Sequence, residues 1–204
     1  MSKKPIIVFE GIEGSGKSHH INRISKYLYK KKIDYIKIRE PGGSLNSEKI
    51  RKLILHEKSK FNVKTDLLLY LAARSENINQ IKKFYKKKVI LIDRFVDSTI
   101  AYQHYGMGID LKIIRLINNF LLKDIKVNYT FLNIVNKKNL FLRLKERKSL
   151  NRYDKFNLNF YDKVQKGFIK LSKKNKKKYQ IVDSNLNIKN NETLIIKQIN
   201  KLIK

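Results

Sequence analysis

The sequence has no cysteine and no tryptophan, only two prolines and eight glycines, and just 17 acidic residues beside 47 Lys and Arg. Without cysteine the chain can form neither a disulfide framework nor a thiolate metal site. Its uncharged apolar runs are short, and residues 67–73 fall far below the roughly 20 residues of a membrane span. No leading apolar segment precedes the first expected strand. We therefore expect a soluble cytoplasmic protein without a signal peptide or membrane segment.

The formal net charge of +30 is the most unusual property of the composition. A charge of this size suggests polyanionic partners. The cations are mostly lysine, however, and they are spread along the whole chain rather than interleaved with aromatic side chains in a basic platform. We therefore expect no specific nucleic-acid binding. With 204 residues and 42% hydrophobic content, the chain can bury one core, so we expect a single domain over residues 1–204.

Residues 6–18 read IIVFEGIEGSGKS, a short apolar strand that leads directly into Gly11-x-x-Gly14-x-Gly16-Lys17-Ser18. Glycines let successive backbone N–H groups converge on one anion, the lysine brings charge to the outer phosphates, and the serine hydroxyl can bind magnesium. Apolar residues at helical spacing follow, which is the strand–loop–helix setting of a phosphate-binding loop. The expected ATP-binding residues here are Gly11, Ile12, Glu13, Gly14, Ser15, Gly16, Lys17 and Ser18.

Strand and helix patterns alternate along the chain. Strands are expected at residues 6–10, 34–39, 89–93, 129–134 and 179–182. Helices are expected from the phosphate loop to about residue 31, and at residues 48–55, 65–85, 111–123, 137–147, 158–173 and 193–203. Such alternation predicts an α/β fold, with a five-stranded, mostly parallel sheet covered by helices on both faces.

Ligands of such sheets bind beyond the carboxyl ends of the strands, where several polar residues of this chain fall. Asp93 ends an apolar strand and, with Ser18, is a candidate for holding Mg²⁺, although an acid there also suits a helix cap. Arg94 follows directly and suits bidentate binding of a phosphate group.

Arginines are rare in this chain, with nine among the 47 basic residues. Where lysine is so common, an arginine suggests a geometry that lysine cannot provide. One group of candidates is Arg39, Arg51, Arg74 and Arg94. A second group, Arg143, Lys145, Arg147 and Arg152, straddles a loop that we expect to act as a lid at about residues 143–155 and to neutralise a transferring phosphoryl group.

Four segments together resemble the thymidylate kinase family of phosphate-loop nucleoside monophosphate kinases. They are FEGIEGSGKS, REPGG, the YLAAR of residues 70–74 and the DRFVDSTIAYQ of residues 93–103. The resemblance covers nearly the whole chain. It implies a three-layer α/β fold, usually a homodimer, that transfers the γ-phosphoryl of ATP to dTMP with Mg²⁺, giving ADP and dTDP for dTTP biosynthesis.

The resemblance also implies roles for individual residues. Tyr70 would stack on the thymine, Arg74 would bond its O4, and Thr99 would read the edge of the base. Glu13 would meet the 3′-hydroxyl of the acceptor sugar, and Tyr102 would disfavour a ribose 2′-hydroxyl. The implied dTMP-binding set is Glu13, Arg39, Arg51, Tyr70, Arg74, Arg94, Thr99, Tyr102 and Gln103.

The phosphate loop carries no arginine, which resembles the bacterial arrangement in which the lid supplies the catalytic cation. Arg152 aligns best with the lid segment of the family and Arg147 is the next candidate, although Asn151 stands where an aspartate is usual. Arg143 is assigned to ATP. The expected catalytic set is Lys17, Arg94, Arg147 and Arg152. The adjacent His19 and His20 point in different directions on a helix, so we expect no metal site there.

Two alternatives remain open at this point. A nucleoside kinase would share the phosphate loop, but a neutral sugar hydroxyl would not need the acceptor-phosphate arginines. A phosphate-loop protein that binds nucleic acid through its +30 charge would show steep salt dependence.

Overall fold

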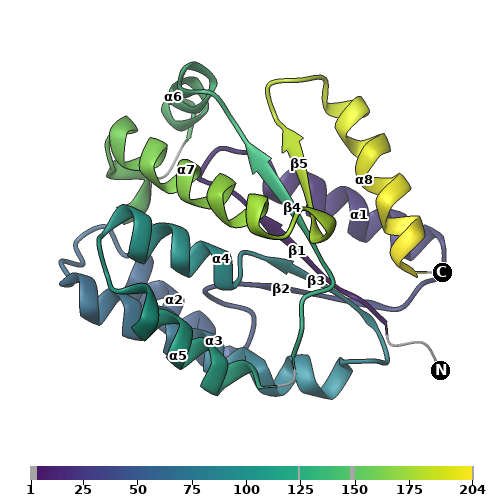
Figure 1. Ribbon diagram of the computed structural model, residues 1–204, viewed down its shortest axis with the longest axis horizontal. Coiled ribbons are helices and arrows are strands. Elements are labelled where there is room, and N and C mark those ends of the chain that lie inside the picture. Colours follow the sequence, from purple (N-terminus) through teal and green to yellow (C-terminus); the bar gives the residue numbers. More distant parts are fainter. Residues whose placement is uncertain (1–3, 124, 148–149, 204) are drawn as a thin grey trace.

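A computed structural model describes residues 4–123, 125–147 and 150–203. Its centre is a five-stranded sheet in the order β2-β3-β1-β4-β5 in which every neighbouring pair of strands is parallel (Figure 1). The strands are β1 (Ile6–Glu10), β2 (Tyr35–Arg39), β3 (Val89–Asp93), β4 (Tyr129–Ile134) and β5 (Tyr179–Asp183). The expected five-stranded α/β fold is confirmed.

Helices connect the strands and cover both faces of the sheet (Figure 1). The α-helices are α1 (Lys17–Lys30), α2 (Leu45–Leu55), α3 (Val63–Phe84), α4 (Val96–Thr99), α5 (Leu111–Leu122), α6 (Lys137–Lys145), α7 (Leu158–Lys174) and α8 (Ile188–Ile203). Three further segments are η1 (Ile100–Gly106), a π-helix, and the 3₁₀ turns η2 (Arg152–Lys155) and η3 (Lys176–Lys178). None of the helices in the described ranges is long and apolar enough to cross a membrane.

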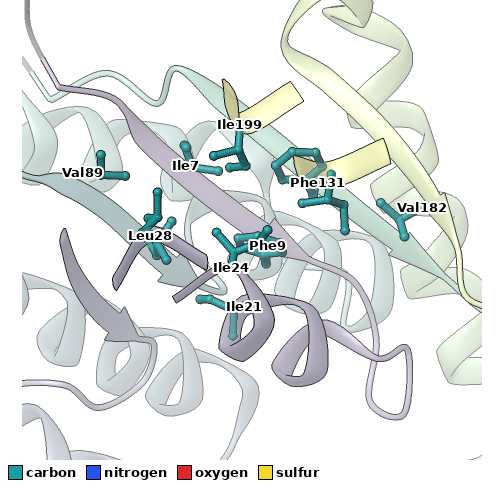
Figure 2. Close-up of a cluster of buried hydrophobic side chains, with 11 residues drawn as sticks. Ile7, Phe9, Ile21, Ile24, Leu28, Val89, Phe131, Val182 and Ile199 are labelled. Atoms are coloured by element: carbon teal, nitrogen blue, oxygen red, sulfur yellow. The ribbon is translucent and has the colours of Figure 1, made fainter. Parts of the chain in front are cut away.

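The two faces of β1 enter different cores because successive strand side chains point to opposite sides. Ile7 and Phe9 pack with apolar side chains of α1 and α8. Figure 2 shows this cluster, with Ile24 of α1 and Ile199 of α8 against the sheet. The intervening Ile6 and Val8 pack on the other face, toward α3. Burial on both faces accounts for the continuous apolar runs of the central strands.

The strand register gathers the functional segments at one edge. Phe9 of β1 and Arg39 of β2 both lie opposite Asp93 of β3. The residues that follow these strands are therefore neighbours in space although they lie far apart in the sequence. The phosphate loop, the turn after β2 and residues 93–103 all leave the sheet at this edge, as the sequence predicts.

Three helices begin earlier than the sequence pattern predicts. Ser44 accepts a hydrogen bond from Ser47 N, so α2 begins at Leu45 and not at residue 48. Asn62 accepts from two backbone N–H groups and starts α3 two residues before the expected residue 65. The last helix begins at residue 188 and not 193. Polar capping residues, which apolar periodicity does not reveal, set these starts.

Residues 96–106 form a helical segment that the sequence analysis did not predict. β-branched and small polar residues give its first half low helix propensity. Packing against α7 holds it, because Gly106 and Gly167 allow close approach of the two elements. A Cβ on Gly167 would lie 2.5 Å from the Tyr105 ring. This segment presents Thr99, Tyr102 and Gln103 to the site described next.

Candidate active site

A cavity of about 610 Å³ opens at the carboxyl edge of the sheet. Its walls are the phosphate loop, the turn after β2, helix α3, residues 93–103 and the lid. The predicted site residues that line it are Glu13, Gly14, Ser15, Gly16, Lys17, Ser18, Arg39, Arg51, Tyr70, Arg74, Asp93, Arg94, Thr99, Tyr102, Gln103, Arg143 and Arg147. Gly11 and Ile12 instead form the buried base of the phosphate loop, and Arg152 of the lid contacts α2.

The phosphate loop has the backbone that an anion cradle needs. Gly16 adopts φ 86° at the start of α1, and Gly11 adopts φ 139°. A Cβ on Gly11 would lie 2.3 Å from the carbonyl oxygen of Asn133, so no other residue fits there without a shift of β4. The loop therefore packs directly against β4, and the N-terminus of α1 faces the cavity.

Lys17 crosses the loop and is buried. Its Nζ donates to Ile12 O at 2.7 Å and lies 3.4 Å from Ser15 Oγ. Burial lowers the pKa of Lys17 to about 7, and the positive charge of Arg94 acts in the same direction. A phosphate placed in the loop would favour the charged ammonium and raise this pKa again.

Ser18 and Asp93 meet at the end of the loop, with Ser18 Oγ 3.3 Å from Asp93 Oδ2. A hydroxyl and a carboxylate are the oxygen ligands that Mg²⁺ prefers. No group of three or more His, Asp or Glu side chains that could hold a metal ion by itself occurs in the part of the chain that the structure describes. These two residues therefore suit a Mg²⁺ ion whose remaining ligands would be substrate phosphates and water. His19 pairs with Glu192 at 2.8 Å.

Arg94 links the phosphate loop to the acceptor side of the cavity. Its backbone is left-handed, with φ 65°, and its guanidinium donates to Gly11 O at 2.8 Å and to Glu13 Oε1 at 2.7 Å. The Tyr102 hydroxyl donates to the other oxygen of Glu13. Burial alone would raise the pKa of Glu13, but the charges of Arg94 and Lys17 outweigh it and lower that pKa. Glu13 is thus an ionised, compensated carboxylate.

Arg74 of α3 lines the cavity, and its side chain is only 2% exposed. Its guanidinium donates to Glu40 Oε2 at 2.7 Å, Asn118 Oδ1 at 2.6 Å and Thr99 Oγ1 at 3.0 Å. The Phe95 ring lies 5.1 Å from its Cζ atom. This network fixes Arg74 and Thr99 relative to each other. Neither Glu40 nor Asn118 is among the residues that the sequence predicts for the site, although Glu40 stands within the REPGG segment.

Arg39 and Arg51 form the outer wall near the turn after β2. Arg39 donates to both carboxylate oxygens of Glu48, at 3.1 and 2.9 Å. Arg51 donates to Pro41 O at 2.7 Å. Two guanidinium groups, with Arg94 opposite, therefore give this half of the cavity an excess of positive charge suited to a phosphate group.

The lid begins at the end of α6, and residues 148 and 149 within it lie outside the described residues. Arg143 bridges two segments, donating to Gly14 O at 2.8 Å and to Ser184 O at 2.7 Å. Arg147 lines the cavity and is paired with Asp154.

Arg152 is placed differently from the expectation. Its Nε donates to Ile54 O at 3.1 Å, and its Nη2 pairs with the buried Asp66. Its guanidinium is therefore engaged between the lid and helices α2 and α3, and it is not among the residues that line the cavity. Of Arg147 and Arg152, the two lid cations expected to be catalytic, Arg147 lines the cavity and Arg152 does not.

Comparison with known proteins agrees with this geometry. The family model for thymidylate kinase matches residues 9–195. The chain belongs to the thymidylate kinase family. Thymidylate kinase of Kosmotoga olearia is 31% identical over 194 residues, covering 94% of this chain and 93% of its own. Thymidylate kinase of Sulfurihydrogenibium is 36% identical over 193 residues, covering 93% and 94%.

A solved structure has the same fold. The crystal structure of thymidylate kinase from Ehrlichia chaffeensis superposes with a TM-score of 0.77 at 30% identity, covering 97% of this chain and 98% of that one. As a thymidylate kinase, the chain is an enzyme that phosphorylates dTMP to dTDP in dTTP synthesis.

Proposed function

We propose that this enzyme transfers the γ-phosphoryl of ATP directly to the phosphate of dTMP, with Mg²⁺, giving ADP and dTDP. The observation that carries the proposal is that one cavity is lined both by the phosphate loop, which we take as its donor half, and by Arg39, Arg51 and Arg74, which we take as its acceptor half. Arg94 lies between the two halves and contacts both. Two nucleotides bound there would meet at their phosphates.

On the donor side, the amides of the phosphate loop and Lys17 would hold the β- and γ-phosphates. Ser18 and Asp93 would hold Mg²⁺, which supplies positive charge to the oxygens of the transferring group when it is bound. Arg143 braces the loop against the residue that follows β5, so it would shape the ATP pocket. The complete ATP-binding set that we propose is the loop from Gly11 to Ser18 with Arg143.

On the acceptor side, Tyr70 would stack on thymine, Arg74 would bond its O4, and Thr99 would contact its edge. Glu13 and Tyr102, already joined by a hydrogen bond, would define the wall beside the sugar. The proposed phosphate ligands are Arg39, Arg51 and Arg94. Gln103 lines the same pocket and completes the acceptor set.

Chemistry in this site requires alignment more than proton transfer. A phosphate dianion is already a nucleophile, so no strong base is needed. The main barrier is the repulsion between two anionic groups, which Lys17, Arg94 and Arg147 would offset from three sides. Arg147 would act after the lid excludes water, since a charge acts more strongly in a dry cavity.

We also propose that the enzyme is a homodimer. Leu68 of α3 and Ile113, Leu116 and Phe120 of α5 are large apolar side chains that are 49% to 72% exposed. Helices α3 and α5 contact each other and lie on the same side of the molecule (Figure 1). A second copy would cover this surface, and a Leu116→Glu/Phe120→Glu variant should then sediment as a monomer.

Because ATP is the proposed donor, we place the reaction in the cytoplasm.

An acceptor panel tests the proposed reaction. ADP formation is followed by a coupled assay with dTMP, dUMP, dCMP, AMP and thymidine as acceptors. We expect dTMP to give the highest kcat/KM and thymidine to give none above the rate without acceptor. Phosphorylation of thymidine in preference to dTMP would establish a nucleoside kinase instead.

A salt titration with single-stranded DNA tests the nucleic-acid alternative. Binding that is steeply salt-dependent and independent of the DNA sequence would be the effect of the +30 charge alone.

A further inference from the structure

Asp66 of α3 is a buried carboxylate whose role neither the phosphate loop nor the acceptor pocket explains. Its side chain is 2% exposed. One oxygen pairs with the Arg152 guanidinium and the other accepts from the Tyr153 hydroxyl. Gln103 Nε2 lies 3.5 Å from the second oxygen. Both lid partners belong to η2, so a single carboxylate on α3 holds the second half of the lid.

Further contacts hold Arg152 in this position. Its Cζ atom lies 5.4 Å from the centre of the Phe61 ring and 5.0 Å from that of Tyr153. Its Nε is bonded to Ile54 O. A guanidinium that contacts two rings and pairs with a buried carboxylate is an anchor, since moving it to a phosphoryl group would leave the Asp66 charge buried without its partner.

The anchored turn contributes a wall of the acceptor pocket. Tyr153 lines the cavity, and its ring centre lies 5.8 Å from those of both Tyr70 and Tyr102. The Tyr161 hydroxyl donates to Tyr153 O at 2.6 Å and fixes the backbone of the turn. Tyr153 therefore packs edge-on against the ring that is proposed to stack on thymine.

Asp66 also shares its helix with the proposed base ligands. Tyr70 and Arg74 follow it at intervals of four residues, which places all three on one face of α3. On the lid side, Asp154 follows Tyr153 directly and pairs with Arg147. A continuous set of contacts thus runs from the base-binding helix, through η2, to the lid cation that lines the cavity.

We propose that Asp66 is a positioning residue that docks the lid on the acceptor helix through Arg152 and Tyr153. Docking completes the dTMP pocket with the Tyr153 ring and orients Arg147 toward the reacting phosphates. The inference rests on the proposed roles of Tyr70 and Arg147. It assigns lid closure to the acceptor half of the site, so occupancy by dTMP should stabilise the docked lid more than occupancy by ATP does.

Kinetics of Asp66→Asn and Tyr153→Phe, which removes only the hydroxyl bonded to Asp66, give the first test. We expect kcat to fall and KM for dTMP to rise, each on the order of 10-fold, while KM for ATP changes less than about twofold. The double variant should be little worse than Asp66→Asn alone, because both changes break one interaction. Asp66→Glu, which keeps a carboxylate, should restore part of the loss.

Glu57→Gln is the matched control, because Glu57 pairs with Lys155 of the same turn at 3.3 Å but both side chains are more than half exposed. It should leave all three constants unchanged. Equal losses in Glu57→Gln and Asp66→Asn, or a rise in KM for ATP alone, would overturn the positioning role.

Limited proteolysis provides a readout that does not depend on activity. Trypsin cleavage after Arg152 and Lys155 should be on the order of 10-fold faster in Asp66→Asn and Tyr153→Phe than in the parent or Glu57→Gln. Adding dTMP should slow cleavage of the parent. Unchanged cleavage in both variants would refute the docking even if the enzyme phosphorylates dTMP. If the parent itself is inactive on dTMP, faster cleavage of the two variants would refute the proposed function and leave the docking intact.

Discussion

Arg94 Nη2 lies 2.7 Å from Glu13 Oε1, so an arginine that follows β3 and an acid of the phosphate loop form an ion pair in the wall of the cavity. Both side chains are largely buried, at 17% and 12% exposure. Each charge is therefore compensated mainly by the other. In the proposed reaction, this pair would join the donor and acceptor halves of the site.

Removing one member of this pair should affect folding and activity differently. Arg94→Met leaves the Glu13 carboxylate buried without its partner and should reduce the free energy of unfolding by about 3 kcal/mol. Arg94→Met/Glu13→Gln removes both charges and should regain most of that stability while remaining inactive. Urea denaturation and kcat/KM separate the two effects. Recovery of activity together with stability would show that Arg94 is structural only.

Arg74 is expected to set affinity for the base. Arg74→Lys keeps a positive charge opposite Glu40 but loses the bonds to Asn118 and Thr99. Loss of one contact to the thymine carbonyl should raise KM for dTMP by a factor that corresponds to roughly 1–3 kcal/mol. KM for ATP should stay within about twofold. A larger change in KM for ATP would place Arg74 on the wrong side of the site.

Arg147 is expected to act on the transition state rather than on binding. Arg147→Ala should lower kcat on the order of 100-fold, about 3 kcal/mol, with little change in equilibrium dTMP binding measured by calorimetry. Lys145→Ala, which removes an exposed cation from the same helix end, is the control and should have no comparable effect. Arg152→Ala should lower kcat through lid position and raise KM for dTMP as well. A silent Arg147→Ala would return the catalytic burden to Lys17 and Arg94.

The lowered pKa of Lys17, about 7, predicts proton uptake on ATP binding. At pH 8 the free amine is mostly neutral, and bound phosphates should protonate it, so about one proton is taken up. ATP affinity should therefore fall as pH rises from 7 to 9. Calorimetry in two buffers of different ionisation enthalpy measures the uptake, and Lys17→Met subtracts protons that the nucleotide itself exchanges. Equal uptake by both proteins would contradict the assignment.

The same pKa shift has a consequence for the stability of the ligand-free protein. The unfolded chain, with its lysine near pKa 10.5, binds more protons than the folded chain between pH 7 and 10.5. The contribution of Lys17 to the free energy of unfolding should therefore increase with pH across this window. Comparison of the parent with Lys17→Met isolates this contribution.

The sequence alone predicted the parts of the site that local patterns determine. The phosphate loop and the Asp93-Arg94 pair each follow an apolar strand directly, so the parallel sheet brings them together. The sequence pattern places the starts of α2, α3 and α8 too late. The observed starts at residues 45, 63 and 188 depend on single capping side chains, which the pattern does not reveal. The segment 96–106 was missed because its residues favour no helix until α7 packs against it.

Long-range partners explain the remaining differences. The match of Arg152 to the lid segment of the family implies a catalytic role for it. Its partner Asp66 lies 86 residues away, and no local pattern connects the two. Asn118 and Glu40, which fix Arg74, are likewise 44 and 34 residues from it. Spacing indicates which cations are unusual, but only the fold determines which of them are already paired.

Direct transfer between two nucleotides in one cavity is the central claim, and label transfer from ATP labelled in its γ-phosphorus measures it. With dTMP present, we predict that the label appears in the β-phosphoryl group of dTDP, with one labelled dTDP for each ADP formed. The Lys17→Ala variant should be folded but should form no labelled dTDP. Label released as inorganic phosphate at a rate independent of dTMP, or near-normal transfer by folded Lys17→Ala, would contradict the account.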